Sequence, residues 1–422
     1  MKEDIKETRL ANGLTILTDR MPHVRSVTLG FFYRIGSRNE PVELNGISHF
    51  IEHAVFKGTT RRTALDIAIE QDRLGGNLEA FTTHEDVGFA IKVIDDQLSD
   101  AFSLIADLMT DPLFDAKELK SEQRVIIEEM KMVEDSPEEF LGEIFSTEFF
   151  PGHPLGLPIA GTPETVRSFG TEITRDYFAA AFSSRNLVIA AAGNIDHEQI
   201  VGLAEKLDFP TGSGPARPNL PPVTAAPILL RHDPGLEQAH LILATPFVAA
   251  LDERRYAADL LSNVLGGGMS SRLWQSIREV NGLAYSVGAS AAMFRDCGFF
   301  SIFAGTSPEQ AEEVVDLSIA ELRSVVRDGI RQEELELAKR QAETSILLSL
   351  EDSAARAAVL AHSEILYGRH IPVGETIDKI RAVTVDDVAA IAHEFFKTES
   401  VAFAALGNLN DTRISRDRLQ IT

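Results

Sequence analysis

The sequence predicts an α+β protein of two similar domains, each a mostly antiparallel sheet with helices packed on one face. Three features lead to this prediction: a Pro- and Gly-rich stretch near the middle, an internal repeat around it, and strands that neighbour one another in sequence with helices grouped between them. A chain of 422 residues is long enough for two domains that each bury a core of their own.

The middle of the chain, residues 208–227, reads DFPTGSGPARPNLPPVTAAP and contains six prolines. Because proline fixes φ and removes a backbone donor, such a stretch does not continue a helix or a central strand. We therefore expect a linker over 208–227 that joins an N-terminal domain (1–207) to a homologous C-terminal domain (228–422).

The two halves match each other at a shift of 214 residues. The matching positions include Arg167 with Arg381, Phe182 with Phe396, and Gly193-Asn194-Ile195 with Gly407-Asn408-Leu409. Because these pairs keep the same order and the shift is close to half the length, we interpret the repeat as a duplication.

Runs rich in β-branched and aromatic residues predict the strands, and apolar residues spaced by three and four predict the helices. In the first half we expect strands near 14–18, 27–35 and 87–94, and helices near 45–57, 62–74, 97–110, 116–134 and 137–149. In the second half we expect strands near 227–232, 237–245, 284–293 and 298–305, and helices near 308–328 and 331–366.

The chain is strongly acidic, with a formal net charge of −24. This balance argues against nucleic-acid partners, whose phosphates need clustered Lys and Arg. The acidity serves either solubility alone or the attraction of cationic substrates, and both readings stay open. No run approaches the ~18 apolar residues of a membrane span. The N-terminus resembles neither a signal nor a transit peptide, and the single Cys297 suits a reducing compartment, so we expect a cytoplasmic protein.

The segment Asn45–His53 reads NGISHFIEH and offers metal ligands. On a helix, His49 and His53 lie one turn apart on the same face, and Glu52 lies beside that face. Two neutral imidazoles with a neighbouring carboxylate suit a hydrolytic zinc site, in which the carboxylate takes a proton from water. A helix that carries these three residues by chance is the alternative.

A catalytic zinc ion usually needs a third protein ligand, and the predicted helix 116–134 supplies glutamates. Glu122 and Glu129 are two turns apart and share a face with Val125 and Ile126, whereas Glu128 points to solvent. Carboxylates on an apolar face are costly unless they are paired or bind a metal. An ordinary solvated face of the helix is the alternative for these acids.

Residues 45–59, NGISHFIEHAVFKGT, resemble the signature of the pitrilysin-like (M16) zinc peptidases, the inverted zincins, in which H-x-x-E-H reverses the commoner H-E-x-x-H. The resemblance implies one Zn²⁺ per chain with His49, His53 and Glu129 as ligands, Glu52 as general base and Glu122 as a supporting acid. It also implies the LuxS/MPP-like metallohydrolase fold, in which only the N-terminal domain binds metal and the C-terminal domain contributes substrate-binding residues.

Two further segments carry the same resemblance. Residues 265–289, LGGGMSSRLWQSIREVNGLAYSVGA, are similar to the family's glycine-rich stretch, and imply that Arg278 and Tyr285 stabilise the substrate carbonyl and its developing negative charge. From the residues alone, Arg278 would be a charge on a helix surface and Tyr285 a core residue of a strand. The triple glycine matches no phosphate-binding loop.

Residues 75–82, GGNLEAFT, resemble the family's edge strand, against which an extended substrate pairs. The positions implied in this pairing are Glu79, Ala80, Phe81 and Thr82. The family usually has Asn where this chain has Glu79, which would favour a positively charged group on the substrate. An ordinary amphipathic strand is the alternative.

Together these resemblances imply a zinc endopeptidase that cleaves peptides or unfolded segments inside an enclosed chamber. The chain's length is similar to the family's short branch, which includes mitochondrial processing peptidase and bacterial homologues, and implies a homodimer or a heterodimer with a related chain. The competing hypothesis is a non-catalytic subunit, but such partners usually have a broken motif and this one is complete.

Overall fold

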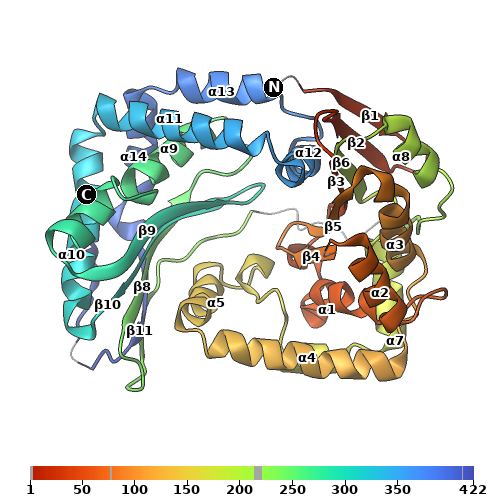
Figure 1. The fold of residues 1–422 in the computed structure, drawn as a ribbon. Coiled ribbons are helices and arrows are strands. Elements are labelled where there is room, and N and C mark those ends of the chain that lie inside the picture. The colour runs from red at the N-terminus through yellow and green to blue at the C-terminus, as the bar shows by residue number, and fades with distance from the viewer. Residues whose placement is uncertain (1–2, 77, 213–220, 411) are drawn as a thin grey trace. The chain divides into compact units, whose positions relative to one another are not determined.

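The computed structural model describes residues 3–76, 78–212, 221–410 and 412–422 (Figure 1). The chain divides into two compact units, which are described separately. Unit 1 comprises Met1–Met132, Leu157–Asn219 and Leu347–Pro372, and unit 2 comprises Val133–Gly156, Leu220–Ile346 and Val373–Thr422.

Unit 1 is built on a six-stranded sheet in which only the β2–β6 pair is parallel. In sheet order its strands are β1 (Ile5–Arg9), β2 (Thr15–Arg20), β6 (Leu187–Gly193), β3 (Ser26–Tyr33), β5 (Val87–Ile94) and β4 (Leu78–Thr82). The strand β4 is therefore an edge strand, as the sequence predicted for this segment.

One face of this sheet packs under helices to form the main core of unit 1. Alternate strand residues such as Leu29, Phe31 and Ile189 point into this core and are fully buried. The helices of unit 1 on or around this face are α1 (Ile47–Ala54), α2 (Ala64–Leu74), α3 (Leu98–Thr110), the first part of α4 (Ala116–Glu134), α6 (Pro163–Ser168), α7 (Thr171–Ala181) and α8 (His197–Ala204).

Unit 2 repeats this plan with a five-stranded sheet. In sheet order its strands are β7 (Ile228–His232), β11 (Ala402–Gly407), β8 (Ala239–Phe247), β10 (Gly298–Thr306) and β9 (Ala284–Met293), and only β7–β11 is parallel. Its helices are α9 (Arg255–Gly266), a π-helix (Trp274–Val280), α10 (Ala311–Asp328), most of α11 (Gln332–Ser349), α13 (Val373–Ala382) and α14 (Val385–Phe395).

Apart from the additional strand β1, the two sheets have the same topology, as the internal repeat predicted. The strands β2, β6, β3, β5 and β4 of unit 1 correspond in order to β7, β11, β8, β10 and β9 of unit 2, and the parallel pair occupies the same place in both. The predicted α+β architecture of two duplicated sheet-and-helix domains is confirmed.

Each unit also contains one helix from the opposite half of the sequence, which the sequence analysis did not foresee. The helix α12 (Ser353–Tyr367) covers the second face of the unit 1 sheet, where Leu360 and Ala361 pack against Leu17, Phe32 and Val188 (Figure 1). The helix α5 (Pro137–Phe149) covers the second face of the unit 2 sheet, over alanines of β11 and β8. Each sheet is therefore apolar on both faces.

The predicted single helix over 331–366 is wrong, because it is two helices. The helix α11 ends at Ser349 and α12 begins at Ser353. The Asp352 carboxylate accepts hydrogen bonds from the backbone N–H groups of Ala354 and Ala355, so Asp352 is an N-cap that starts a new helix. This break separates α12 from α11 and lets α12 join unit 1.

The predicted domain boundary stays a prediction. Residues 213–220 lie outside the described residues, and the described parts of the expected linker, 208–212 and 221–227, contain neither helix nor strand. Within the described residues, no helix combines the length and apolar composition that crossing a membrane requires.

Charged contacts fix α12 to the unit 1 sheet. Arg356 forms an ion pair with Asp19 of β2, and both side chains are about 4% exposed. Glu364 forms ion pairs with Arg34 at 2.6 Å and with Arg9 at 2.9 Å. Because a buried charge without its partner is strongly unfavourable, the Arg356–Asp19 pair makes the register of α12 specific.

We predict that Asp19→Ala destabilises the protein by about 3–5 kcal/mol, because Arg356 then stays buried without its partner. Denaturant unfolding would measure this loss. Glu128→Ala, which breaks the exposed Lys131–Glu128 pair, is the control and should leave the free energy of unfolding nearly unchanged. Equal effects of the two substitutions would contradict the importance assigned to the buried pair.

Candidate metal centre

The helix α1 begins at a glycine that no other residue could replace easily. Gly46, its N-cap, has φ of 93°, and a Cβ there would lie 2.5 Å from the carbonyl oxygen of Ala160. The cap itself has no side chain to bond the free N–H groups of the first turn.

Glu40 takes over this capping role from outside the helix. Its carboxylate accepts hydrogen bonds from the backbone N–H of Gly46 at 2.7 Å and of Ser48 at 2.8 Å. Burial raises the pKa of Glu40 to about 7, although the two N–H donors favour its charged form. Glu40 therefore ties the start of α1 to the preceding loop.

His49 and His53 lie one turn apart on α1, with ring centres 4.7 Å apart. Burial is the larger cause and the charge of His53 the smaller, and together they lower the pKa of His49 to about 4. Its imidazole is therefore neutral at neutral pH. The Nδ1 atom of His49 is buried and has no hydrogen-bond partner among the described residues. A neutral ring of this kind suits a metal ligand.

The carboxylate of Glu122, on α4, orients His53. It lies 3.3 Å from His53 Nδ1, and the Lys57 ammonium contacts its other oxygen at 2.7 Å. Burial pushes the pKa of Glu122 up, but the hydrogen bonds to His53 and Lys57 outweigh it and lower the pKa below its usual value. Glu122 is thus a buried anion that holds one ring nitrogen of His53 and leaves Nε2 for a ligand.

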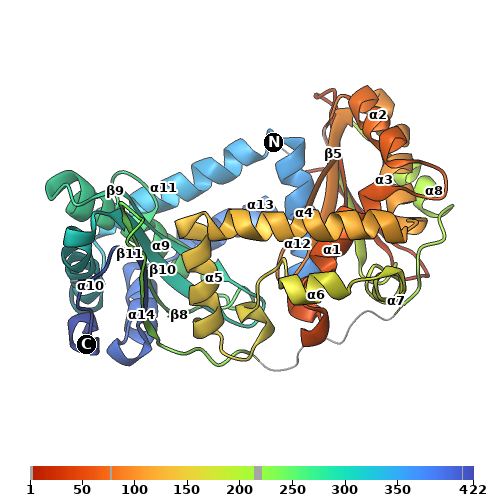
Figure 2. The ribbon, with the colours of Figure 1, turned by 90° about the horizontal axis from the view of Figure 1, so that it is seen from below.

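Glu129 completes a three-residue cluster with the two histidines. The helices α1 and α4 lie side by side in both views, and Glu129 Oε2 is 3.5 Å from His53 Nε2 (Figures 1 and 2). Ligand atoms of His49, His53 and Glu129 all lie within 4.8 Å of one another. Two ligands on a tetrahedral zinc ion lie ~3.3 Å apart for bonds of about 2.0–2.2 Å, so the donor set suits zinc and the His53–Glu129 pair has close to the required spacing.

Glu52 projects from the same helix and is fixed by the edge strand. The Thr82 hydroxyl on β4 donates a hydrogen bond of 2.6 Å to Glu52 Oε2. Burial raises the pKa of Glu52, with Glu129 adding to the rise, while Thr82 and His53 act in the opposite direction. A partly buried carboxylate next to the cluster can accept a proton at the site.

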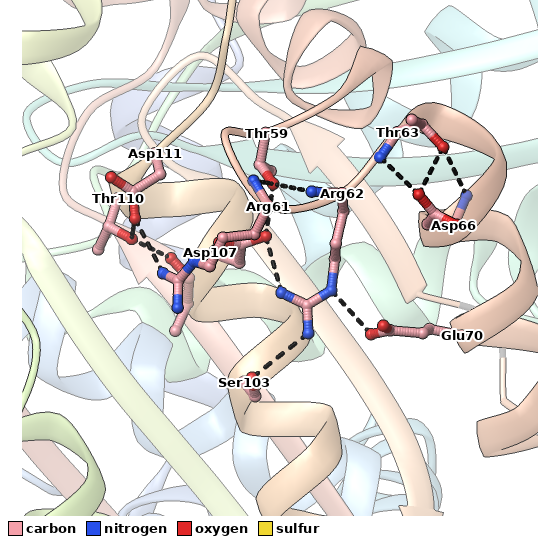
Figure 3. A network of polar contacts seen from close by, with 11 residues as sticks. Thr59, Arg61, Arg62, Thr63, Asp66, Glu70, Ser103, Asp107, Thr110 and Asp111 are labelled. Carbon is pink, nitrogen blue, oxygen red and sulfur yellow. Dashed lines mark hydrogen bonds and ion pairs between the residues drawn. The ribbon is translucent and has the colours of Figure 1, made fainter.

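The turn that follows this helix is held by a separate network (Figure 3). Asp107 on α3 is buried, and it accepts hydrogen bonds from the Thr59 hydroxyl at 2.6 Å and from Arg62 at 2.8 Å. Arg61 also contacts Asp107 at 2.7 Å, and Arg62 reaches Glu70 at 2.9 Å. This network fixes the chain just after Lys57, and so supports the contact of Lys57 with Glu122.

The other predicted site residues lie as follows. Glu128 is exposed and pairs with Lys131, as expected, whereas Val125, expected on the apolar face, is 42% exposed. Arg278 and Tyr285 lie in unit 2, where the Arg278 guanidinium carbon is 4.8 Å from the centre of the Tyr285 ring. Tyr285 is 80% exposed, so it is not a core residue. A role of these two residues at the metal cluster stays a prediction.

On the edge strand, Glu79 and Phe81 are exposed, while Ala80 and Thr82 are half-buried. Asn77, which precedes the strand, lies outside the described residues. Substrate pairing by Glu79, Ala80, Phe81 and Thr82 stays a prediction.

Sequence reasoning missed two residues of the site, Glu40 and Lys57, and one contact, that of Thr82 with Glu52. Glu40 precedes the metal helix by several residues, and an acid shortly before an uncapped Gly could have signalled a remote cap. For Lys57 and Thr82 no local pattern exists, because their partners lie 65 and 30 positions away in sequence.

Comparison with known proteins identifies the family. The family model described as "Insulinase (Peptidase family M16)" matches residues 15–163, and "Peptidase M16 inactive domain" matches residues 171–342. A protein of Streptomyces coelicolor described as an uncharacterized zinc protease is 36% identical over 420 residues, which cover 98% of this chain and 91% of that protein. The chain belongs to peptidase family M16. The resemblance predicted from residues 45–59 is confirmed.

Further M16 relatives and solved structures agree. A protein of Bacillus subtilis, also described as an uncharacterized zinc protease, is 37% identical and covers 95% of this chain and 98% of its own. One of Rickettsia felis with the same description is 35% identical and covers 98% of this chain and 100% of its own. Crystal structures of a protease from Helicobacter pylori and of a peptidase M16 inactive domain from Pseudomonas fluorescens each have a TM-score of 0.88. The first is 22% identical and matches over its whole length, the second is 20% identical and matches over 98% of its length, and each covers 96% of this chain. At these identities they support the fold alone.

We predict that Glu40→Ala destabilises the helix α1, because two N–H groups at its start lose their acceptor. The expected loss of stability is about 1–3 kcal/mol, since two buried N–H groups are left without their acceptor. Thermal unfolding and metal content would measure the effect. Glu43→Ala, an exposed acid in the same loop, is the matched control and should change neither.

We also predict that Glu122→Gln lowers metal affinity by about 10–100-fold, as loss of a group that orients a ligand typically does. Metal competition with a chelator of known affinity would measure it. Glu118→Gln, in the first turn of the same helix, is the control. Unchanged affinity in Glu122→Gln would show that His53 does not depend on this carboxylate.

Proposed function

We propose that the protein is a zinc-dependent endopeptidase that hydrolyses peptides or unfolded segments, with Glu52 as general base. The observation that carries the proposal is the convergence of His49, His53 and Glu129 within 4.8 Å, with the Glu52 carboxylate on the same helix. The order His-x-x-Glu-His supports a site of the inverted zincin type. The M16 relatives are described as zinc proteases, which supports the metal and the activity.

In this proposal His49, His53 and Glu129 would hold one Zn²⁺ per chain. Bound zinc would supply a Lewis acid that polarises the peptide carbonyl and brings the pKa of water to about 7. Glu52, held by Thr82, accepts a proton from the attacking water and then donates it to the leaving amine. Glu122 keeps the His53 ring in place through Nδ1, which would leave Nε2 to bind the ion.

The substrate would lie as an extended strand along β4. An edge strand offers unpaired backbone groups to a peptide, with side chains of Glu79, Ala80, Phe81 and Thr82 along the contact. The exposed Glu79 and the net charge of −24 favour cationic peptides. Arg278 and Tyr285 would donate hydrogen bonds to the substrate carbonyl as negative charge develops on it.

The resemblance to the family's short branch extends this proposal to assembly. Two copies, or this chain and a related one, would enclose a chamber that admits unfolded peptides and excludes folded proteins. The mass of the purified protein in solution, compared with the mass of one chain, distinguishes a single chain from such a pair. A cytoplasmic location is part of the same proposal, on the basis of the single Cys297.

We predict that Glu52→Gln abolishes turnover, by at least about 1,000-fold in kcat, while zinc content stays near one ion per chain, because Gln cannot accept the proton. Cleavage of a quenched, unstructured peptide and metal analysis measure the two quantities. Chelation should silence the wild type, and added zinc should restore it.

Glu43→Gln is the matched control, since it removes an exposed acid before the same helix. Persistent zinc-dependent cleavage by Glu52→Gln would refute the role of Glu52. A wild type that holds zinc but cleaves no peptide would instead favour the non-catalytic subunit, unless a second chain restores cleavage.

A further inference from the structure

The guanidinium of Arg278 in unit 2 contacts two aromatic rings. Its guanidinium carbon is 4.1 Å from the centre of the Trp274 ring and 4.8 Å from the centre of the Tyr285 ring. Both distances are within the ~6 Å at which a cation and an aromatic face attract each other. The rings therefore limit the rotation of a side chain that otherwise has many rotamers.

The N–H groups of this guanidinium have no acidic partner among the described residues, although the chain has 64 acids and 40 basic residues. Its neighbour Glu279 accepts a hydrogen bond of 3.1 Å from the Trp274 indole N–H instead. Because no described residue accepts a hydrogen bond from these N–H groups, they are available to a ligand oxygen.

The local backbone explains why one tryptophan contacts both neighbours. Residues Trp274–Val280 form a π-helix, whose turn closes on the fifth residue and is wider than an α-helical turn. The fourth and fifth residues after Trp274, which are Arg278 and Glu279, therefore both lie next to its ring. A π-helix is rare and costs regular hydrogen bonding, and such segments often occur at functional sites.

We propose that Trp274 is a positioning residue, which holds the Arg278 guanidinium so that its edge donates to a backbone carbonyl of the peptide substrate. This inference rests on the proposed peptidase function. Trp274 also holds the carboxylate of Glu279 through its indole N–H. The opposing interpretation is that Trp274 only packs against the core of unit 2, which it also contacts.

Trp274 is the chain's single tryptophan, so its fluorescence reports on this site alone. The test is a titration of zinc-loaded Glu52→Gln protein, which cannot turn over, with an unstructured peptide that lacks tryptophan. We expect a saturable change in tryptophan emission that is lost when Arg278→Ala is added. An equal change without Arg278 would overturn the proposal.

A double-mutant cycle separates positioning from packing. Trp274→Ala should lower kcat/KM by about tenfold, or ~1.4 kcal/mol, whereas Trp274→Phe, which keeps an aromatic face, should stay within about twofold. In the Arg278→Ala background, Trp274→Ala should have no further effect. The proposal is overturned if Trp274→Ala lowers kcat/KM equally with and without Arg278.

A matched control addresses folding. Phe140→Ala breaks another stack in unit 2, in which the Arg231 guanidinium carbon is 4.6 Å from the Phe140 ring centre, and should leave kcat/KM unchanged. The two proposals can also fail separately. If the wild type cleaves the peptide but the cycle shows no coupling, only the role of Trp274 is refuted, whereas a zinc-loaded wild type without cleavage refutes the peptidase function.

Discussion

The whole site depends on an eight-residue helix that would not be stable by itself. The helix α1 carries His49, Glu52 and His53, but an isolated helix shorter than about 12 residues is marginal in water. Its stability and position must come from contacts outside it. Glu40 binds its first turn, Glu122 holds His53 near its last turn, and Thr82 holds Glu52. The ligands are thus preorganised by residues that bind no metal themselves.

The exchange of α5 and α12 makes each sheet dependent on the other half of the sequence. The strand β6 is buried along its whole length, with Ile189 facing the helices of unit 1 and Val188 facing α12. The same alternation holds in β11, where Phe403 and Ala404 face opposite cores. A half-chain would expose one apolar sheet face to water, which is unfavourable at about 25 cal/mol per Å². The duplicated halves are therefore not independent folding units, although their topology is the same.

Local patterns in the sequence predicted the elements well and their long-range contacts poorly. The helix 116–134, the helix 137–149 and the strand 284–293 have the predicted bounds, because periodicity and composition are local properties. The metal cluster was predictable because helical spacing and a family signature agree. The break at Asp352 was missed because apolar spacing continues across it. Glu40 was missed because its partners are backbone N–H groups, which apolar spacing does not reveal.

The duplication also shows how one fold can supply two kinds of chemistry. In unit 1 the connection from β3 to the edge strand β4 carries α1 with His49 and His53, and in unit 2 the connection from β8 to the edge strand β9 carries the π-helix with Trp274 and Arg278. Both connections leave a central strand and return to the edge, so each places its side chains beside an open strand edge. In one copy these side chains suit a cation, and in the other they offer N–H donors. Because the corresponding strands are arranged in the same way, the difference lies in the side chains that the connecting segments carry.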